Sequence, residues 1–200
     1  MKLYYSPGAC SLASHIVLEE IGQPYEAERA DIRAKTTASG GDFRAVNPKG
    51  AVPALVLEDG SVLTEGVVIM QYVAELAGAA HLVPASGIAR ARVQEMLNYI
   101  ASEVHKTYSP LFRPGVSADF KAAQLAHLDA KLGALETVLA DGRDYLTGHF
   151  SPADGYLFTV TNWSKPMGHD LSGFPLITAL RDRVAARPAV RAAMQAEGLI

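Results

Sequence analysis

The stretch YSPGACSLASH, residues 5–15, joins a predicted strand to a predicted helix. Lys2 to Tyr5 alternates polar and apolar residues as a short strand does, and Pro7-Gly8 is a turn signal. Residues 12–17 then begin an apolar stripe at helical spacing. The chain has one cysteine, Cys10, and this pattern places it where the strand ends and the helix begins.

The start of a helix changes the chemistry of a thiol. The first backbone N–H groups of a helix have no partner inside it, and the helix dipole favours negative charge there. Cys10 should therefore ionise more easily than an ordinary thiol, and the thiolate is the reactive form. The alternative is that Cys10 is a small buried filler, because cysteine is among the most buried residue types.

Composition narrows the class of protein. The chain has 200 residues, of which 49% are hydrophobic, and this suffices for one large domain or two small ones. A net charge of −3 without a run of Lys and Arg argues against a nucleic-acid partner. One cysteine excludes an internal disulfide and fits a reducing compartment.

Targeting and metal signals are also missing. The N-terminus shows no basic region followed by a long apolar run, and no stretch of about 18 apolar residues occurs. We therefore expect a cytoplasmic protein without a membrane partner. The six histidines lie far apart and form no HxxxH pattern, so we expect no metal site.

Residues 1–77 read as an α/β domain. The predicted strands lie at residues 2–5, 25–28, 54–57 and 61–63, and the predicted helices begin near residues 10, 43 and 65. The last two strands flank Asp59-Gly60, a hairpin turn, and Thr64 is expected to cap the helix that follows. The order β-α-β-α-β-β-α is typical of an α/β sandwich.

The remainder of the chain reads as helical. Residues 78–87 are predicted to be a linker, because small residues and Pro84 replace the strand pattern, and residues 88–200 an all-α domain. The apolar stripe of its first helix consists of Val93, Leu97, Ile100 and Val104. A polar group roughly 150° around that helix, at about 100° per residue, consists of Asn98, Ser102, His105 and Lys106.

Two features near the ends of predicted strands indicate a binding site. Val52-Pro53 precedes a strand, where a proline is ordinary, but a cis bond would turn the Val52 backbone outward toward an extended ligand. Glu65-Gly66 begins a helix, whose N–H groups can bind a carboxylate while Glu65 accepts an ammonium. Acids are also common in first turns for dipole reasons alone. Together with Cys10, the pattern favours a small thiol peptide as ligand.

Several motifs spread over all 200 residues form one combination. They are KLYYSPGACSLA at 2–13, AVNPKG at 45–50, VPAL at 52–55, LTEG at 63–66, LNYIA at 97–101, EVHK at 103–106, RPAV at 187–190 and AEGL at 196–199. In this combination the chain resembles the bacterial beta-class glutathione transferases. The resemblance implies a thioredoxin-like N-terminal domain, an all-α C-terminal domain carrying the acceptor-substrate pocket, a homodimer, and a cis bond at Val52-Pro53. It also implies glutathione as co-substrate, with no cofactor, and a small electrophilic apolar acceptor.

The resemblance assigns roles to five residues of the N-terminal domain. Cys10 would face the sulfur of glutathione and could form a mixed disulfide with it. Lys35 would meet the glycyl carboxylate, and Val52 the cysteinyl backbone. Glu65 and Gly66 would bind the γ-glutamyl end. Many transferases of other classes have serine after the acid, so a glycine here should weaken binding of that end.

Five further residues lie in the predicted helical domain. His105 and Lys106 would approach the sulfur and act as catalytic residues beside Cys10. Asn98, Ser102 and Glu103 would complete the glutathione pocket, some of them across the dimer interface. The polar group found by helical spacing contains four of these five residues.

Ser151 and Asp154 have the spacing of a capping box, with Pro152 at the first helical position. The relatives complete a hydrophobic staple five positions after the residue equivalent to Phe150. Here that position is Gly155, so this helix start should be weaker than usual.

Other residues allow two interpretations. Six could line an apolar acceptor pocket or belong to an ordinary core, and these are Tyr108, Leu111, Phe112, Pro114, Trp163 and Met167. His15 and His169 have no partner that the sequence can name.

We interpret the chain as a glutathione transferase that conjugates the glutathione thiolate to electrophilic apolar substrates, with accessory thiol–disulfide exchange through Cys10 and a role in detoxification. One alternative is a glutaredoxin-like thiol–disulfide oxidoreductase, although no second cysteine stands near Cys10 to resolve the disulfide. Another is a non-catalytic binding protein for apolar compounds.

Overall fold

The computed structural model describes residues 1–200, whose packing divides them into two compact units. The first unit comprises Met1–Ala85 with Ala186–Ile200, and the second comprises Ser86–Ala185. The C-terminal helix belongs to the first unit because it packs against the first helix of the chain. The domain limits predicted from the sequence, near residues 77 and 88 with a helical part to 200, therefore differ from these packing units mainly at the C-terminus.

The first unit is an α/β sandwich. Its strands are β1 (Lys2–Tyr5), β2 (Glu26–Asp31), β3 (Thr36–Thr37), β4 (Ala54–Val56) and β5 (Val62–Thr64). Its helices are α1 (Ser11–Ile21), α2 (Phe43–Val46), α3 (Gly66–Leu76) and α10 (Pro188–Ala196). The sheet order is β3-β2-β1-β4-β5, in which β1 and β2 are parallel and the other neighbours antiparallel.

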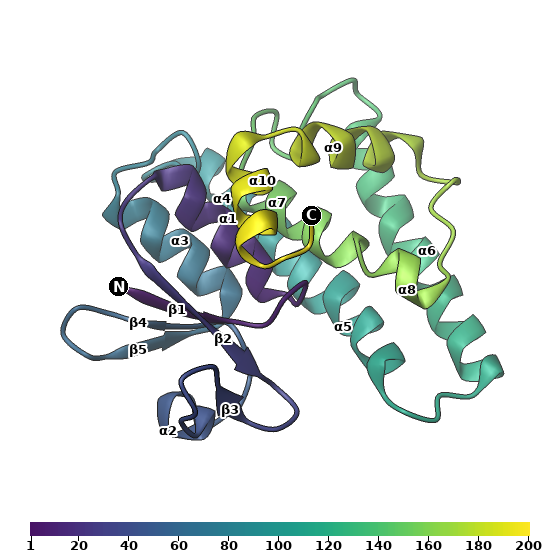
Figure 1. Ribbon diagram of the computed structural model, residues 1–200. Coiled ribbons are helices and arrows are strands. Elements are labelled where there is room, and N and C mark those ends of the chain that lie inside the picture. The colour runs from purple at the N-terminus through teal and green to yellow at the C-terminus, as the bar shows by residue number, and fades with distance from the viewer. The chain divides into compact units, whose positions relative to one another are not determined.

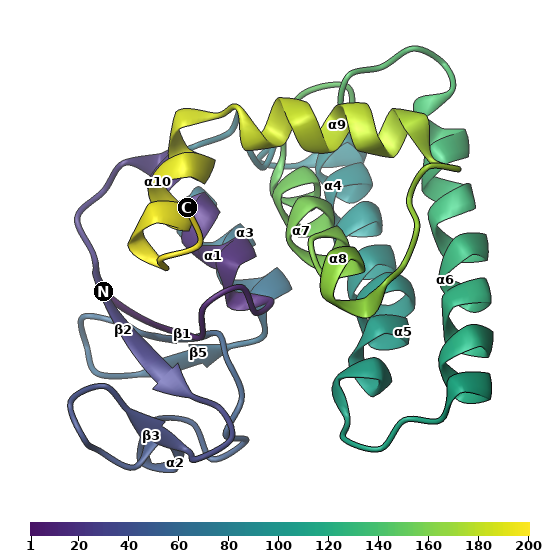
Figure 2. The same cartoon turned by 45° about the vertical axis from the view of Figure 1, so that its right-hand side comes forward.

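The core of this unit lies between the sheet and its helices. Figure 1 shows α1 and α3 side by side over one face of the sheet, and Figure 2 shows α10 beside α1. Leu3 pairs with Leu55 across β1 and β4, and both are fully buried. The stripe on α1 that the sequence predicts is buried as well, and Gly22 ends this helix in the left-handed conformation.

Two details differ from the sequence predictions. The short strand β3 was not predicted, because its two threonines lie in a polar stretch without a strand pattern. Thr64 does not cap α3, since it is the last residue of β5, and Glu65 is the N-cap residue with φ 70°. The helix near Phe43, the hairpin and the cis bond at Val52-Pro53 are confirmed.

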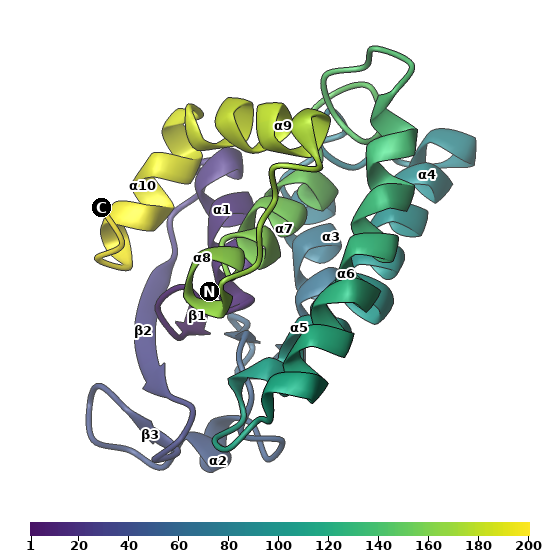
Figure 3. The same ribbon diagram turned by 90° about the vertical axis from the view of Figure 1, so that its right-hand side faces the viewer.

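The second unit is entirely helical. A continuous helical stretch consists of α4 (Gly87–Tyr99), the π-helix η1 (Ile100–His105), α5 (Lys106–Tyr108) and the 3-10 helix η2 (Ser109–Phe112). The others are α6 (Ala118–Leu139), α7 (Pro152–Thr161), α8 (Ser164–Met167) and α9 (Pro175–Ala185). Figure 3 shows α6 running beside the stretch that contains α4 and α5. No helix of the chain is both long and apolar enough to cross a membrane.

The π-helix changes the helical face on which polar residues lie. Its hydrogen bonds run from i to i+5, so each turn holds more residues than an α-helical turn. The apolar stripe from Val93 to Val104 is buried as predicted. Asn98 and Ser102 are exposed, whereas His105 is half-buried. The expected alignment of these three side chains rests on regular α-helical spacing, and the π-helix at 100–105 interrupts that spacing.

Candidate functional site

Cys10 occupies the N-cap position of α1 and is half-buried. Its thiol donates a hydrogen bond to the backbone carbonyl of Val52, with Sγ and O 3.3 Å apart. Val52 is buried and forms the cis bond to Pro53. The structure therefore brings together Cys10 and Val52, which lie 42 residues apart and which the sequence assigned to one site.

We call residues Tyr5–Cys10 the thiol loop. Ser11 fixes it from inside, because its Oγ accepts a hydrogen bond from the Ser6 N–H at 3.1 Å and lies 3.3 Å from the Ser6 carbonyl oxygen. The Ala9 N–H donates to the same Ser6 carbonyl at 3.0 Å. These bonds make a tight turn that places Cys10 at the start of α1.

Lys35 takes a left-handed conformation with φ 61°, which is uncommon for a residue with a side chain. Its ammonium group donates to the Gly50 carbonyl at 2.7 Å, and the side chain is half-buried. Gly50 also has positive φ, and its N–H donates to the Asn47 carbonyl. Lys35 is thus held against the segment that leads to Val52.

Glu65 and Gly66 form the start of α3, and Glu65 is exposed. Lys49 contacts Glu65 with Nζ 2.7 Å from Oε1 and reaches Thr64 Oγ1 at 3.1 Å. A Cβ added at Gly66 would lie 3.4 Å from Pro53 and 3.6 Å from Ser14, which is ordinary van der Waals contact. A small side chain would therefore fit at position 66, so steric crowding does not require a glycine there. The Ser14 hydroxyl is buried there without a hydrogen-bond partner.

In the second unit, His105 lies at the end of the π-helix. Its Nδ1 is 2.6 Å from the Tyr156 hydroxyl, and its ring packs against Trp163 with centroids 5.0 Å apart. Burial, with a smaller effect of the Lys106 charge, lowers the pKa of His105 to about 4. The imidazole is therefore neutral at neutral pH and can offer a hydrogen bond, but no charge. Tyr156 is a site candidate that no sequence motif indicated.

The remaining candidates of this unit lie on the surface of the same helical stretch. Ser102 Oγ donates to the Asn98 carbonyl at 3.0 Å. Glu103 forms an ion pair with Lys131 of α6, with Oε2 and Nζ 2.7 Å apart. The hydrogen bond from Lys131 lowers the pKa of Glu103. Lys106 is exposed and follows His105 directly.

Aromatic rings surround His105. Trp163 makes edge-on contacts with Tyr108 and Phe112, at centroid distances of 5.9 Å and 5.2 Å. Tyr108 is fully buried and Trp163 nearly so, whereas 44% of Phe112 is exposed. Of the apolar candidates, Tyr108 therefore belongs to the core, and Phe112 remains accessible to a ligand.

The two histidines without predicted partners have partners from distant parts of the sequence. His15 Nδ1 is 2.9 Å from Glu197 Oε1. His169 lies between the Tyr108 hydroxyl, 2.7 Å from Nδ1, and Asp129, 2.8 Å from Nε2. Both rings are buried, so each pairing satisfies a polar group that water cannot reach.

The capping box at the start of α7 is confirmed. The Ser151 N–H donates to Asp154 Oδ2 at 2.9 Å, and the Leu146 N–H donates to Oδ1 at 2.8 Å. Asp154 is fully buried, and this burial raises the pKa of its carboxyl to about 6 against the opposing effect of the hydrogen bonds. Phe150 packs its ring against Tyr145, with centroids 5.7 Å apart.

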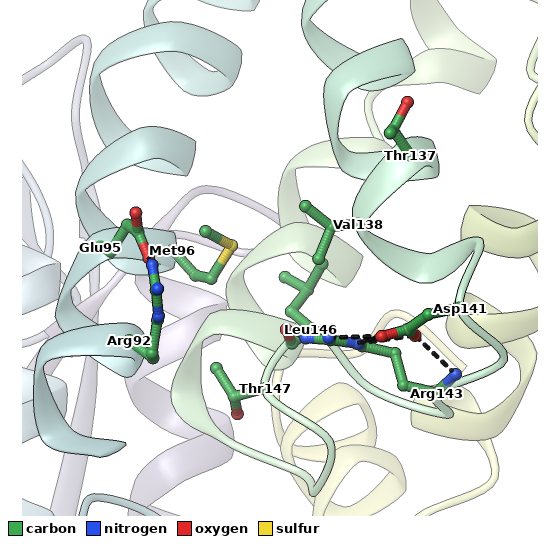
Figure 4. Close-up of a pocket in the computed structure, with 9 residues that line it drawn as sticks. All are labelled: Arg92, Glu95, Met96, Thr137, Val138, Asp141, Arg143, Leu146 and Thr147. Carbon is green, nitrogen blue, oxygen red and sulfur yellow. Dashed lines mark hydrogen bonds and ion pairs between the residues drawn. The ribbon is translucent and has the colours of Figure 1, made fainter. Parts of the chain in front are cut away.

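A cavity of about 540 Å³ in the second unit contains none of the predicted site residues. Figure 4 shows its lining, which consists of Arg92, Glu95, Met96, Thr137, Val138, Asp141, Arg143, Leu146 and Thr147. Both arginines are already held by neighbouring carboxylates, Arg92 by Glu95 and Arg143 by Asp141. The cavity therefore offers no spare cationic group to an anionic ligand. No three His, Cys, Asp or Glu side chains gather as metal ligands.

Comparison with known proteins identifies the family. Residues 8–76 match the model of the glutathione S-transferase N-terminal domain, and residues 118–196 match that of the C-terminal domain. Glutathione S-transferase GstA of Escherichia coli O157:H7 is 46% identical over 200 residues, which cover 100% of both chains.

Solved structures of glutathione S-transferases are also similar to the chain. A bacterial beta-class glutathione S-transferase of Sphingomonas chungbukensis is 43% identical with a TM-score of 0.95 and 100% coverage of both chains. A sphingomonad glutathione S-transferase complexed with glutathione is 44% identical, with a TM-score of 0.94 and 100% coverage of both chains.

The chain belongs to the glutathione S-transferase family. Within that family it resembles the bacterial beta class, as the sequence predicted. It is an enzyme that uses glutathione as co-substrate, and the predicted fold of an α/β N-terminal part followed by helices is confirmed.

Proposed function

We propose that this transferase joins the glutathione thiolate to small electrophilic apolar acceptors and also exchanges thiols with glutathione mixed disulfides through Cys10. The observation that carries the proposal is the position of the thiol at the N-terminus of α1. Helix N-termini favour thiolates over thiols. No second cysteine exists in the chain, so glutathione must supply the resolving thiol.

The exchange reaction balances with glutathione as the only reductant. The Cys10 thiolate attacks the glutathione sulfur of a mixed disulfide, the substrate leaves as a thiolate, and Cys10 becomes glutathionylated. A second glutathione thiolate then attacks the glutathione sulfur of this enzyme disulfide, which yields glutathione disulfide and restores the Cys10 thiolate. In conjugation, by contrast, the attacking sulfur belongs to glutathione itself.

The proposed glutathione contacts follow from the chemistry of each group. Lys35 supplies a cation for the glycyl carboxylate, and the Val52 backbone pairs with the cysteinyl part. Glu65 accepts the γ-glutamyl ammonium, and the N–H groups at the start of α3 from Gly66 onward bind its carboxylate. Lys49, which contacts Glu65 in the structure, would have to share this acid with the ligand.

In the second unit we propose that His105 and Lys106 stabilise the thiolate, and that Asn98, Ser102 and Glu103 add polar contacts to glutathione. His105 is neutral near pH 7, so its contribution is a donated hydrogen bond, and Lys106 contributes the charge. When the Tyr156 hydroxyl donates to Nδ1, the imidazole proton resides on Nε2 and is available to the sulfur.

We further propose a homodimer, a cytoplasmic location and a role in detoxification, with a glutathione-binding domain at residues 1–77 and an acceptor-binding helical domain at 88–200. One exposed apolar stripe on α3 supports the dimer. Val68, Tyr72 and Leu76 repeat every four residues and are 46%, 37% and 55% exposed. Contiguous exposed apolar surface is typical of an interface between protein chains.

Two rates measured side by side test the proposal against its alternatives. Parent enzyme should conjugate an aryl halide and also reduce a glutathione mixed disulfide. Cys10→Ala should abolish the disulfide activity and reduce conjugation only in part. Disulfide activity without conjugation would favour the glutaredoxin-like alternative, and the absence of both would favour a binding protein. Full disulfide activity in Cys10→Ala would contradict the role of Cys10.

A further inference from the structure

The thiol loop is held from outside by the C-terminal end of the chain. Glu197 follows α10, and its Oε2 accepts a hydrogen bond from the Gly8 N–H at 2.9 Å. Gly8 has φ 67°, a conformation that residues with side chains seldom adopt, and it lies two residues before Cys10. The same C-terminal segment approaches the loop at Leu199, which would lie 3.6 Å from a Cβ added to Gly8.

Glu197 is itself fixed by His15. The other carboxylate oxygen, Oε1, is 2.9 Å from His15 Nδ1, and the two side chains are 1% and 0% exposed. Because Nδ1 faces a carboxylate, it carries a proton and donates it to the hydrogen bond. The rings of Tyr5 and Tyr25 pack against His15, with centroids 5.3 Å and 5.7 Å away. The carboxylate therefore has no room to turn toward water.

We propose that Glu197 is a positioning residue for Cys10, acting through the backbone of Gly8. The inference rests on the reactive role of Cys10 in the proposed function. Glu197 keeps the turn of the thiol loop closed, and the closed turn keeps the Cys10 thiol at the N-terminus of α1. Without the carboxylate, the partly buried Gly8 N–H loses this acceptor and the loop shifts to find another one. The thiol then leaves the favourable field of the helix.

The single cysteine allows this to be measured directly. Alkylation of the folded chain by iodoacetamide reports Cys10 alone, because the sequence contains no other thiol. In Glu197→Ala, the midpoint of the alkylation rate against pH should rise by at least about half a unit, toward the ordinary cysteine value of about 8.5. Glu197→Gln should stay close to the parent midpoint. Its amide oxygen can still accept from Gly8, and its NH2 group can donate to His15 Nδ1 once the imidazole proton moves to Nε2.

A matched control separates positioning of Cys10 from general attachment of α10 to α1. Arg187 and Glu20 also join α10 to α1, with Nε and Oε1 2.6 Å apart, and Glu20 lies near the end of α1 that is far from the thiol loop. Glu20→Ala should lower stability and leave the alkylation midpoint unchanged. Equal midpoints in Glu197→Ala and parent, or an equal shift in Glu20→Ala, would overturn the proposal.

A second measurement needs no variant that could fail to fold. The Gly8 amide of the parent should exchange its hydrogen slowly, because the N–H is hydrogen-bonded to a buried carboxylate, and rapid exchange would also overturn the proposal. Neither readout depends on turnover. If the activities of Cys10→Ala contradicted the proposed function, the alkylation midpoint and the Gly8 exchange rate would still test whether Glu197 positions the thiol.

Discussion

Replacement of Asp154 by alanine should cost more stability than the loss of a helix cap alone. The sequence places Asp154 in a capping box, and the loss of such a cap costs about 0.5–2 kcal/mol. With Gly155 in place of the staple residue, the sequence predicts the upper half of that range. The structure adds a contact outside the cap, because the carboxylate also binds the Leu146 N–H at 2.8 Å.

The magnitude follows from the groups left behind. The N–H groups of Leu146 and Ser151 both lose a buried acceptor, and each unsatisfied buried donor costs about 1–3 kcal/mol. Part of this loss of stability is offset near pH 7, because the parent protein must bury a charged carboxylate, which is itself unfavourable, and the alanine variant does not. We therefore expect a loss of about 3 kcal/mol at pH 7, or roughly 6–12 °C in Tm for a chain of this size.

The pH dependence has a defined sign. Asp154 has a folded-state pKa of about 6, above its ordinary value of 3.8, so between these values the folded chain binds more protons than the unfolded one. The stability contributed by this group is therefore present at low pH and lost as pH rises through about 6. The cost of Asp154→Ala should be about 1 kcal/mol larger at pH 5 than at pH 7.

Urea denaturation followed by the fluorescence of Trp163, the only tryptophan, measures this effect in the second unit. Asp170→Ala is the matched control, because Asp170 also accepts two hydrogen bonds, from the Ser172 N–H and hydroxyl, but at the surface. Water can replace it there, so we expect a cost within about 0.5 kcal/mol. Equal midpoints and slopes for the two variants would refute the reasoning.

Three further predictions concern activity and assembly. His105→Ala should shift the pH–rate profile of aryl-halide conjugation at saturating glutathione upward, with a modest change in glutathione affinity, and a one-unit shift corresponds to about 1.4 kcal/mol of lost thiolate stabilisation. Superimposable profiles with equal plateaus would mean that His105 is not involved. Tyr156→Phe should lower kcat roughly fivefold at constant KM, because one hydrogen bond of about 1 kcal/mol no longer fixes the imidazole, and an unchanged kcat would exclude that role. Leu76→Glu should produce monomers in sedimentation experiments, because it places a charge on the apolar stripe of α3, and an unchanged sedimentation coefficient would exclude this interface.

Local patterns predicted those parts of the site whose partners are close in the sequence. The turn signal and the helical stripe located Cys10 at the start of α1, and the spacing of Ser151 and Asp154 was sufficient to predict the capping box. The position of His105 could not be predicted in the same way. A π-helix has no spacing signal of its own, so an assumed 100° per residue placed His105 on the same face as the exposed Ser102.

Contacts between residues far apart in the chain also could not be predicted from the sequence. Tyr156 is 51 residues from His105, and Glu197 is 182 residues from His15. In each case the residue types were visible, but nothing in the sequence indicates which distant side chain a histidine will pair with. Only the packing of α10 against α1 brings Glu197 to the thiol loop.

The two buried histidines nevertheless differ in what their partners can do. Asp129 binds His169, but 54% of its side chain is exposed, so it can turn into water when the histidine is lost. Glu197 is fully buried and binds a backbone N–H as well as His15, so the loss of either contact leaves a polar group without solvent. A substitution at His169 should therefore release Asp129 to water and leave the buried Tyr108 hydroxyl without its partner, both within the second unit. A substitution at His15 should instead be transmitted to the backbone of the thiol loop. For this reason Glu197, and not the more exposed pair of Asp129 and His169, is the residue that can position Cys10.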